Sequence, residues 1–232
     1  MEKCKKKQNK GQEEKMNDKE KEKLLLLICK KENRKIFLRR LNKIRTYGIF
    51  EYQKTDFEDI VKIFLTILDN IQIEKDIFSF QLCIILSQTF YYTENENKKY
   101  LYKCIKSHSI FSSEEIWKNC VNYFIETEVD KYNQIKNDIT VKKSNNTINE
   151  LIFAQLVANT NNMIEFDFDV NIIENIIMEN INKYKLSEKS KKIILNIINN
   201  KRNKCKDEKN NKSEKKQNNN ANNKNDNNKT ND

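Results

Sequence analysis

A long apolar segment that carries several amide side chains is the feature that most constrains the fold of this chain. It spans residues 147–170, TINELIFAQLVANTNNMIEFDFDV. On a helix with about 100° per residue, its apolar side chains cover more than about 120° of the circumference, and Asn159 falls inside that arc. A helix that is apolar over so wide an arc has to be largely surrounded by its neighbours. The segment is therefore predicted to be the central helix of a small all-helical domain.

Two amides of this segment, Gln155 and Asn159, are candidates for a buried polar site. A buried Asn side chain without partners costs about 1–3 kcal/mol, so we expect Asn159 to hydrogen-bond across to another helix or loop. Such a bond either fixes the register of the helix or forms part of a polar site in a groove. Most buried polar side chains have structural partners, which favours the first interpretation.

The remaining apolar residues also recur at helical spacing, which predicts an all-α chain of about seven helices packed as an antiparallel bundle or a short α-solenoid. No segment is a convincing strand. Residues 133–146 are predicted to be a polar loop and 98–107 to contain a short helix. The longer helices are predicted within 21–47, 55–71, 76–92, 114–129, 147–170, 170–184 and 187–200.

Local signals mark several of these helix ends. The pattern Ser/Thr-x-x-Glu of a capping box occurs at Thr55, Ser112 and Thr147, each time before an apolar periodic run. Gly48 suits the left-handed position that ends a helix, and Ser187 is a plausible N-cap for the last one.

The charge is distributed unevenly along the chain. The whole chain carries a formal +10, to which residues 1–23 contribute +3, 24–35 another +3 and 201–232 a further +5, so that 36–200 carries −1. A nucleic-acid-binding domain is expected to show a basic face within its fold, so the neutral middle argues against specific nucleic-acid recognition. Residues 1–20 and 201–232 are too polar to bury a core and are predicted to be disordered tails around a helical domain of residues 21–200.

The sequence offers no recognisable catalytic, cofactor or metal site. The six cysteines include no CxxC pair, which argues against a metal knuckle. The only histidine, His108, has no motif around it, and an enzymatic site would need it to converge with Gln155 and Asn159 in one pocket. Trp117 lies on an apolar stripe and is expected in the core. The charged N-terminus and the short aliphatic runs favour a cytoplasmic protein with reduced thiols that is either soluble or peripheral to membranes.

The predicted N-terminal helix is the best candidate for an exposed interaction surface, because it mixes aliphatic residues with many cations. Such a helix either lies on an anionic membrane or packs its apolar side on the domain and leaves its cations in solvent. The residues of this candidate basic face are Lys30, Lys31, Arg34, Lys35, Arg39 and Arg40.

Several stretches together resemble one known helical domain: FLRRLNKIRTYGIFE, FEDIVKIFLTILD, YLYKCIKSHSIFSSEEIWKNCVNYFIETEV and ELIFAQLVANTNNMIEFDFD. This is the domain of the myotubularin-related SET-binding-factor family, shared with otherwise uncharacterised eukaryotic proteins. The similarity covers residues 36–200. In that family a Trp often stands near the position of Phe111, and a Gly often stands at the position of Asp167.

The resemblance implies a role in membrane traffic or small-GTPase regulation and no catalytic residues. The expected function is therefore a non-enzymatic helical protein-interaction module that acts as an adaptor, with a protein partner and no cofactor. Two alternatives stay open: peripheral membrane or nucleic-acid binding through the basic flanks, and an enzyme with an unrecognised site. The flanks are expected to give at most a weak contact with an anionic membrane.

Overall fold

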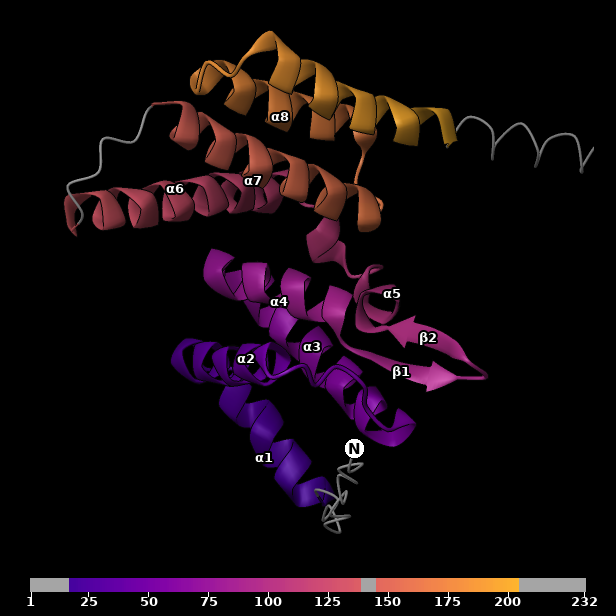
Figure 1. The fold of residues 1–232 in the computed structure, drawn as a ribbon. Helices are drawn as coiled ribbons and strands as arrows, with labels where there is room; N and C mark the ends of the chain where they lie inside the picture. The colour runs from indigo at the N-terminus through magenta and orange to yellow at the C-terminus, as the bar shows by residue number, and fades with distance from the viewer. Residues whose placement is uncertain (1–16, 139–144, 205–232) are drawn as a thin grey trace, which may run out of the picture.

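The computed structural model describes residues 17–138 and 145–204, and within them the predicted all-α class is confirmed. The helices lie between α1 (indigo) at one end and a last helix (yellow) at the opposite end (Figure 1), and neighbours in space are not always neighbours in the chain, since α2 packs on α4. This arrangement is closer to a short helical stack than to a closed bundle. The helices are α1 (Asp18–Ile28), α2 (Lys31–Thr46), α3 (Lys54–Glu74), α4 (Ile77–Thr89), α5 (Leu101–Ile105), η1 (Ser109–Ser112), α6 (Glu114–Asp138), α7 (Asn145–Glu165), α8 (Val170–Lys183) and a last one over 188–204.

The helix at the centre of the packing is α4, and the prediction that 147–170 would be central is wrong. α4 packs against α2, α3, α5 and α6, and none of its side chains is exposed. The helix α7 packs mainly on α6 and α8 and leaves Ala154, Ala158 and Asn161 exposed. Because these side chains are small or carry an amide, exposing this outer side of α7 to water costs little free energy.

One continuous apolar core joins the N-terminal half of the stack, α1 to α5, to the C-terminal half, α6 to the last helix. Trp117 is fully buried there, as expected, and its indole N–H donates to the carbonyl of Phe111 at 2.9 Å. Its ring meets Phe80 of α4 edge to face, with centroids 5.2 Å apart. This aromatic contact ties α6 to the central helix.

The single helix predicted over 21–47 is instead two helices, α1 and α2. The chain breaks at Lys30, whose backbone is extended with φ −79° and ψ 126°. Apolar periodicity continues through the break, so the pattern alone did not reveal it. The predicted end of α2 is confirmed in position, because Gly48 follows it with φ +80°.

The helix starts follow the predicted capping pattern only in part. Thr55 and Thr147 lie inside α3 and α7, which begin earlier, so neither is an N-cap. At α6 the cap is shifted by one residue, since the Ser113 hydroxyl accepts from the N–H of Ile116 at 3.4 Å. Ser187 does cap the last helix, because its hydroxyl accepts from the N–H of Ser190 at 3.2 Å. A full capping box at Asn17 and Glu20 opens α1 and was not predicted.

A small β-hairpin stands where no strand was expected. Strand β1 (Tyr91–Glu94) pairs antiparallel with β2 (Asn97–Tyr100) around a two-residue turn. Both turn residues, Asn95 and Glu96, have positive φ, as a hairpin turn that matches the strand twist requires. The sequence pattern that indicates this hairpin is in YYTENENKKY, where a start rich in Tyr and Thr is followed by Asn.

The predicted boundaries of the helical domain are too narrow. α1 begins at Asp18, inside the predicted tail, and the last helix continues through residue 204. Helices α6 and α7 also extend into the predicted loop of 133–146. The rest of both predicted tails, 1–16 and 205–232, lies outside the described residues.

Candidate functional site

The predicted basic face contains one residue that is not on the surface at all. Arg34 is fully buried, and its guanidinium lies where α1, α2, α3 and α4 meet. Nη1 donates to the carbonyls of Ile28 and Cys29 at 3.3 and 3.2 Å. Nη2 lies 2.6 Å from Glu74 Oε2 and 3.3 Å from Asp76 Oδ2. The assignment of Arg34 to an exposed interaction face is therefore wrong.

Asp76 extends this network into the central helix. Its carboxylate is also buried, and Oδ2 accepts from the Ser79 hydroxyl at 2.7 Å. Oδ1 accepts from the Ser79 N–H at 3.4 Å, which makes Asp76 the N-cap of α4. Because Arg34 also holds the last carbonyls of α1, a single cation fixes the turn between α1 and α2 against the start of α4. Removing one partner of such a buried pair costs several kcal/mol.

The other five residues of the predicted basic face occupy three different environments. Lys35 is partly buried and lies 3.3 Å from Glu32, one turn before it on α2. Lys30 and Lys31 are exposed at the turn between α1 and α2, whereas Arg39 and Arg40 are exposed farther along α2. Within the described ranges none of these last four cations forms an ion pair.

The outward side of α2 and its end form a surface that we call the α2 ridge. Arg34, Leu38 and Leu41 face inward, which turns the opposite side of the helix to solvent. The guanidinium of Arg39 lies over the Phe78 ring of α4, 4.8 Å from its centroid, and is held there by a cation–π contact. The ridge consists of Ile36, Arg39, Arg40, Lys43 and Tyr47.

Two members of the ridge are apolar side chains that sequence analysis assigned no role. Ile36 is 47% exposed and Tyr47 is 70% exposed, and Ile49 in the following loop is 53% exposed. Ile36 lies on the side of α2 opposite its buried face. The spacing of the residues predicts this exposure only if Arg34 points inward, and a basic residue among aliphatic ones usually points to solvent.

The second predicted site, Gln155 and Asn159, is not a polar groove. Asn159 is fully buried, but its amide N–H donates to the Gln155 carbonyl on the same helix at 2.8 Å. Its Oδ1 has no hydrogen-bond partner among the described residues. The expected bond across to another element is made by Asn162 instead, whose Oδ1 accepts from Gln88 of α4 at 3.2 Å.

His108 has different neighbours from the two amides. Its Nε2 lies 3.0 Å from Asp69 Oδ1 on α3, and its Nδ1 accepts from the N–H of Ile110 at 3.2 Å. It thereby caps the short helix η1. These contacts give His108 a structural role between α3 and η1, and the structure does not bring it together with Gln155 and Asn159 through any bond.

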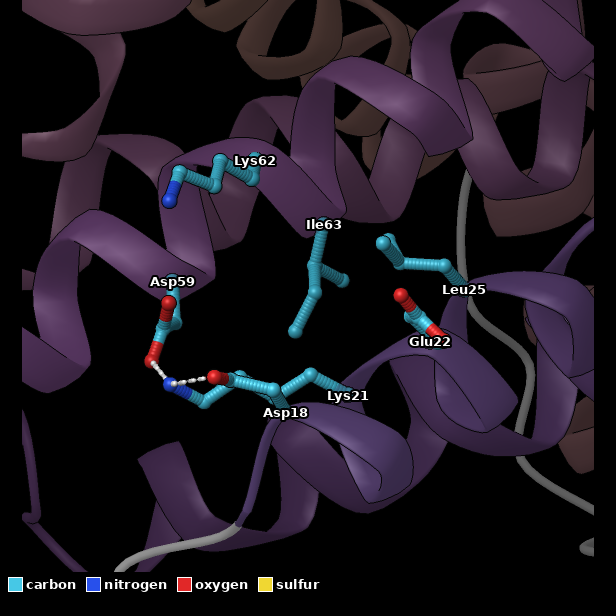
Figure 2. A pocket seen from close by; sticks show the side chains of 7 residues that line it. All are labelled: Asp18, Lys21, Glu22, Leu25, Asp59, Lys62 and Ile63. Atoms are coloured by element: carbon cyan, nitrogen blue, oxygen red, sulfur yellow. Dashed lines mark ion pairs between the residues drawn. The ribbon is translucent and has the colours of Figure 1, made fainter.

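A cleft of about 260 Å³ lies between α1 and α3, with charged side chains around Leu25 and Ile63 (Figure 2). Lys21 crosses it and lies 2.8 Å from Asp59 and 3.8 Å from Asp18. The hydrogen bond to Asp59 raises the pKa of Lys21 above its usual value. The cleft thus marks where the N-terminal half of α1 is attached to α3, while Arg34 holds the other end.

In residues 17–138 and 145–204, no three His, Cys, Asp or Glu side chains are grouped closely enough to hold a metal ion. No described helix combines the length and the apolar character that a bilayer crossing needs. Compared with protein-family models, with curated proteins and with solved structures, the chain matches none.

Proposed function

We propose that this chain is a non-enzymatic helical interaction module, an adaptor that binds an acidic protein surface through the α2 ridge. The observation that carries the proposal is the composition of the ridge. Three exposed cations, Arg39, Arg40 and Lys43, form no ion pair with any described carboxylate and stand among the exposed apolar side chains of Ile36 and Tyr47. Uncompensated charge of one sign attracts a partner of the other sign.

A protein is a better match to the ridge than other acidic surfaces. Arg and Tyr are enriched at protein interfaces and among the residues that dominate binding energy. Arg39 is already positioned on Phe78, so less side-chain freedom is lost when it binds. The ridge also belongs to a helix that is anchored on the central helix α4, which provides a rigid base.

The resemblance to the SET-binding-factor domain stays a prediction, and it would place this adaptor in membrane traffic or small-GTPase regulation. Two local features support it. Asp167 has φ +55°, the conformation that favours the Gly often found there in the family. Phe111 is buried and stacked on Phe166, with centroids 4.2 Å apart, so a large aromatic suits that position.

Site-directed crosslinking tests the ridge with the full chain. A photo-crosslinking residue at position 36 should capture a discrete protein through an acidic segment, and that product should be lost in Arg39→Glu/Arg40→Glu. The matched control is Lys189→Glu/Lys192→Glu, the same charge change at exposed lysines of the last helix. The proposal fails if both variants keep the product, if both lose it, or if the captured segment is not acidic.

A further inference from the structure

A second surface of the molecule lies at the turn between α1 and α2, which we call the α1–α2 corner. It is formed by Lys23, Leu26, Leu27, Lys30, Lys31 and Ile73. Leu26 and Leu27 are 73% and 44% exposed, and Ile73 at 81% is more exposed than either. Covering such side chains would gain free energy, and exposed aliphatic side chains that are grouped together mark a surface for a protein or a membrane.

The two parts of the corner come from different helices and are held together by side-chain contacts. The Asn70 amide of α3 lies 3.7 Å from Cys29 Sγ, and Glu74 of α3 pairs with Arg34 at 2.6 Å. Ile73 lies in the last turn of α3, between Asn70 and Glu74 along the chain, and points to solvent beside these contacts. Leu26 precedes Cys29 by three residues and so lies on the same side of α1, next to the junction with α3, whereas Leu27 lies on the outer side of α1.

The charge around these aliphatics is mainly positive. Residues 23–31, KLLLLICKK, contain three lysines and no acidic residue, and within the described ranges none of the three forms an ion pair. The neighbouring carboxylates offset them only in part, since Glu32 is paired with Lys35 and Glu22 is a single charge at the cleft between α1 and α3. Residues 1–16, which precede α1, add six lysines and three glutamates, a further +3.

We propose that the α1–α2 corner docks on an anionic lipid bilayer, with Leu26, Leu27 and Ile73 entering the interface and the lysines facing acidic headgroups. Exposed leucines flanked by lysines are typical of helices that lie in a membrane interface. Lysine is depleted at protein interfaces, whereas its long stem lets the ammonium reach headgroups while the stem stays apolar. The occupant thus differs from that of the α2 ridge, and an adaptor with both surfaces would hold an acidic protein at a membrane.

Vesicle co-sedimentation of the full chain tests this inference. Vesicles of phosphatidylcholine with about one third phosphatidylserine should bind the chain, and pure phosphatidylcholine should not. The attraction to the headgroups is electrostatic, so binding should weaken as salt is raised. Lys30→Glu/Lys31→Glu and, separately, Leu26→Ser/Leu27→Ser should each lower the partition coefficient about tenfold or more, because the first removes headgroup attraction and the second removes insertion.

Matched controls lie on the last helix: Lys189→Glu/Lys192→Glu for charge and Ile193→Ser for an exposed aliphatic. Both should bind as the wild type does. Circular dichroism of every variant confirms that it is folded, and because all substituted side chains are exposed, folding should be kept. The inference is overturned if the leucine variant binds normally, if the charge control loses as much as the corner variant, or if a DNA duplex or polyglutamate is bound with the same pattern of losses.

Discussion

Two regions of this molecule bury polar side chains, and they do so in opposite ways. In the N-terminal half, Arg34 reaches acceptors on α1, on α3 and at the start of α4. In the C-terminal half, Asn159 of α7 and Asn180 of α8 each donate to the carbonyl four residues earlier on their own helix. The Oδ1 atoms of both amides lack partners among the described residues, whereas Arg34 lacks a partner only at Nε.

The difference shows which buried polar groups specify an arrangement of helices. A side chain that is bonded to several elements is satisfied only when those elements are in place, so it selects one packing. A side chain that is bonded to its own helix is equally satisfied in any packing and adds only a desolvation cost. We therefore expect the Arg34 network to carry much more stability than the two amides.

The largest expected effect is that of Arg34→Met. This substitution removes the cation between two carboxylates and leaves Asp76 buried without a counter-charge. The free energy of unfolding, measured in denaturant, should therefore fall by about 3 kcal/mol or more. Arg40→Met, the same change at an exposed position of α2, should stay within about 0.5 kcal/mol of the wild type. Equal losses for the two variants would contradict the importance assigned to burial.

Coupling between Arg34 and Asp76 is the next effect in size. Asp76→Asn keeps a side-chain oxygen that can cap α4 and removes only the charge. A double-mutant cycle with Arg34→Met should give a coupling energy of about 1–3 kcal/mol. Additive losses would mean that the two side chains act independently despite the 3.3 Å between them.

Asn159→Leu should change the free energy of unfolding by less than about 1 kcal/mol, because it replaces an unpaired oxygen by apolar volume. Asn162→Leu should cost more than this, since it breaks the bond to Gln88 of α4. Denaturant unfolding of both variants measures the difference. The reverse order would show that Asn159 has a cross-helix partner after all.

The smallest effect concerns a surface pair. The hydrogen bond from the Lys106 ammonium, 2.6 Å from Asp167, lowers the pKa of that carboxyl below its usual value. A lowered folded-state pKa stabilises the fold above the unfolded pKa, and that contribution disappears as pH falls through the folded value. The difference in Tm between wild type and Asp167→Asn should therefore be small at pH 6 and shrink toward pH 3. A constant difference would refute this origin.

The fold class and most helices could be predicted from the sequence because apolar periodicity survives in a chain with so much Lys and Asn. The break between α1 and α2 after Cys29 could not be predicted, because the apolar residues from Leu24 to Leu41 keep helical spacing across it. The buried position of Arg34 depends on Glu74 and Asp76, forty or more residues later, and no local pattern connects them. Of the predicted basic face, Lys30, Lys31, Arg39 and Arg40 are exposed and Arg34 is buried, and the binding role of the exposed four stays a prediction.

Hydrogen–deuterium exchange of Arg34→Met tests the central claim, that one buried cation fixes the α1–α2 corner, most directly. In the folded variant, the amides of α1 and of residues 29–31 should exchange much faster than in the wild type, while those of α7 and α8 should change far less. Unchanged protection of α1, or the same acceleration in all helices, would contradict the claim.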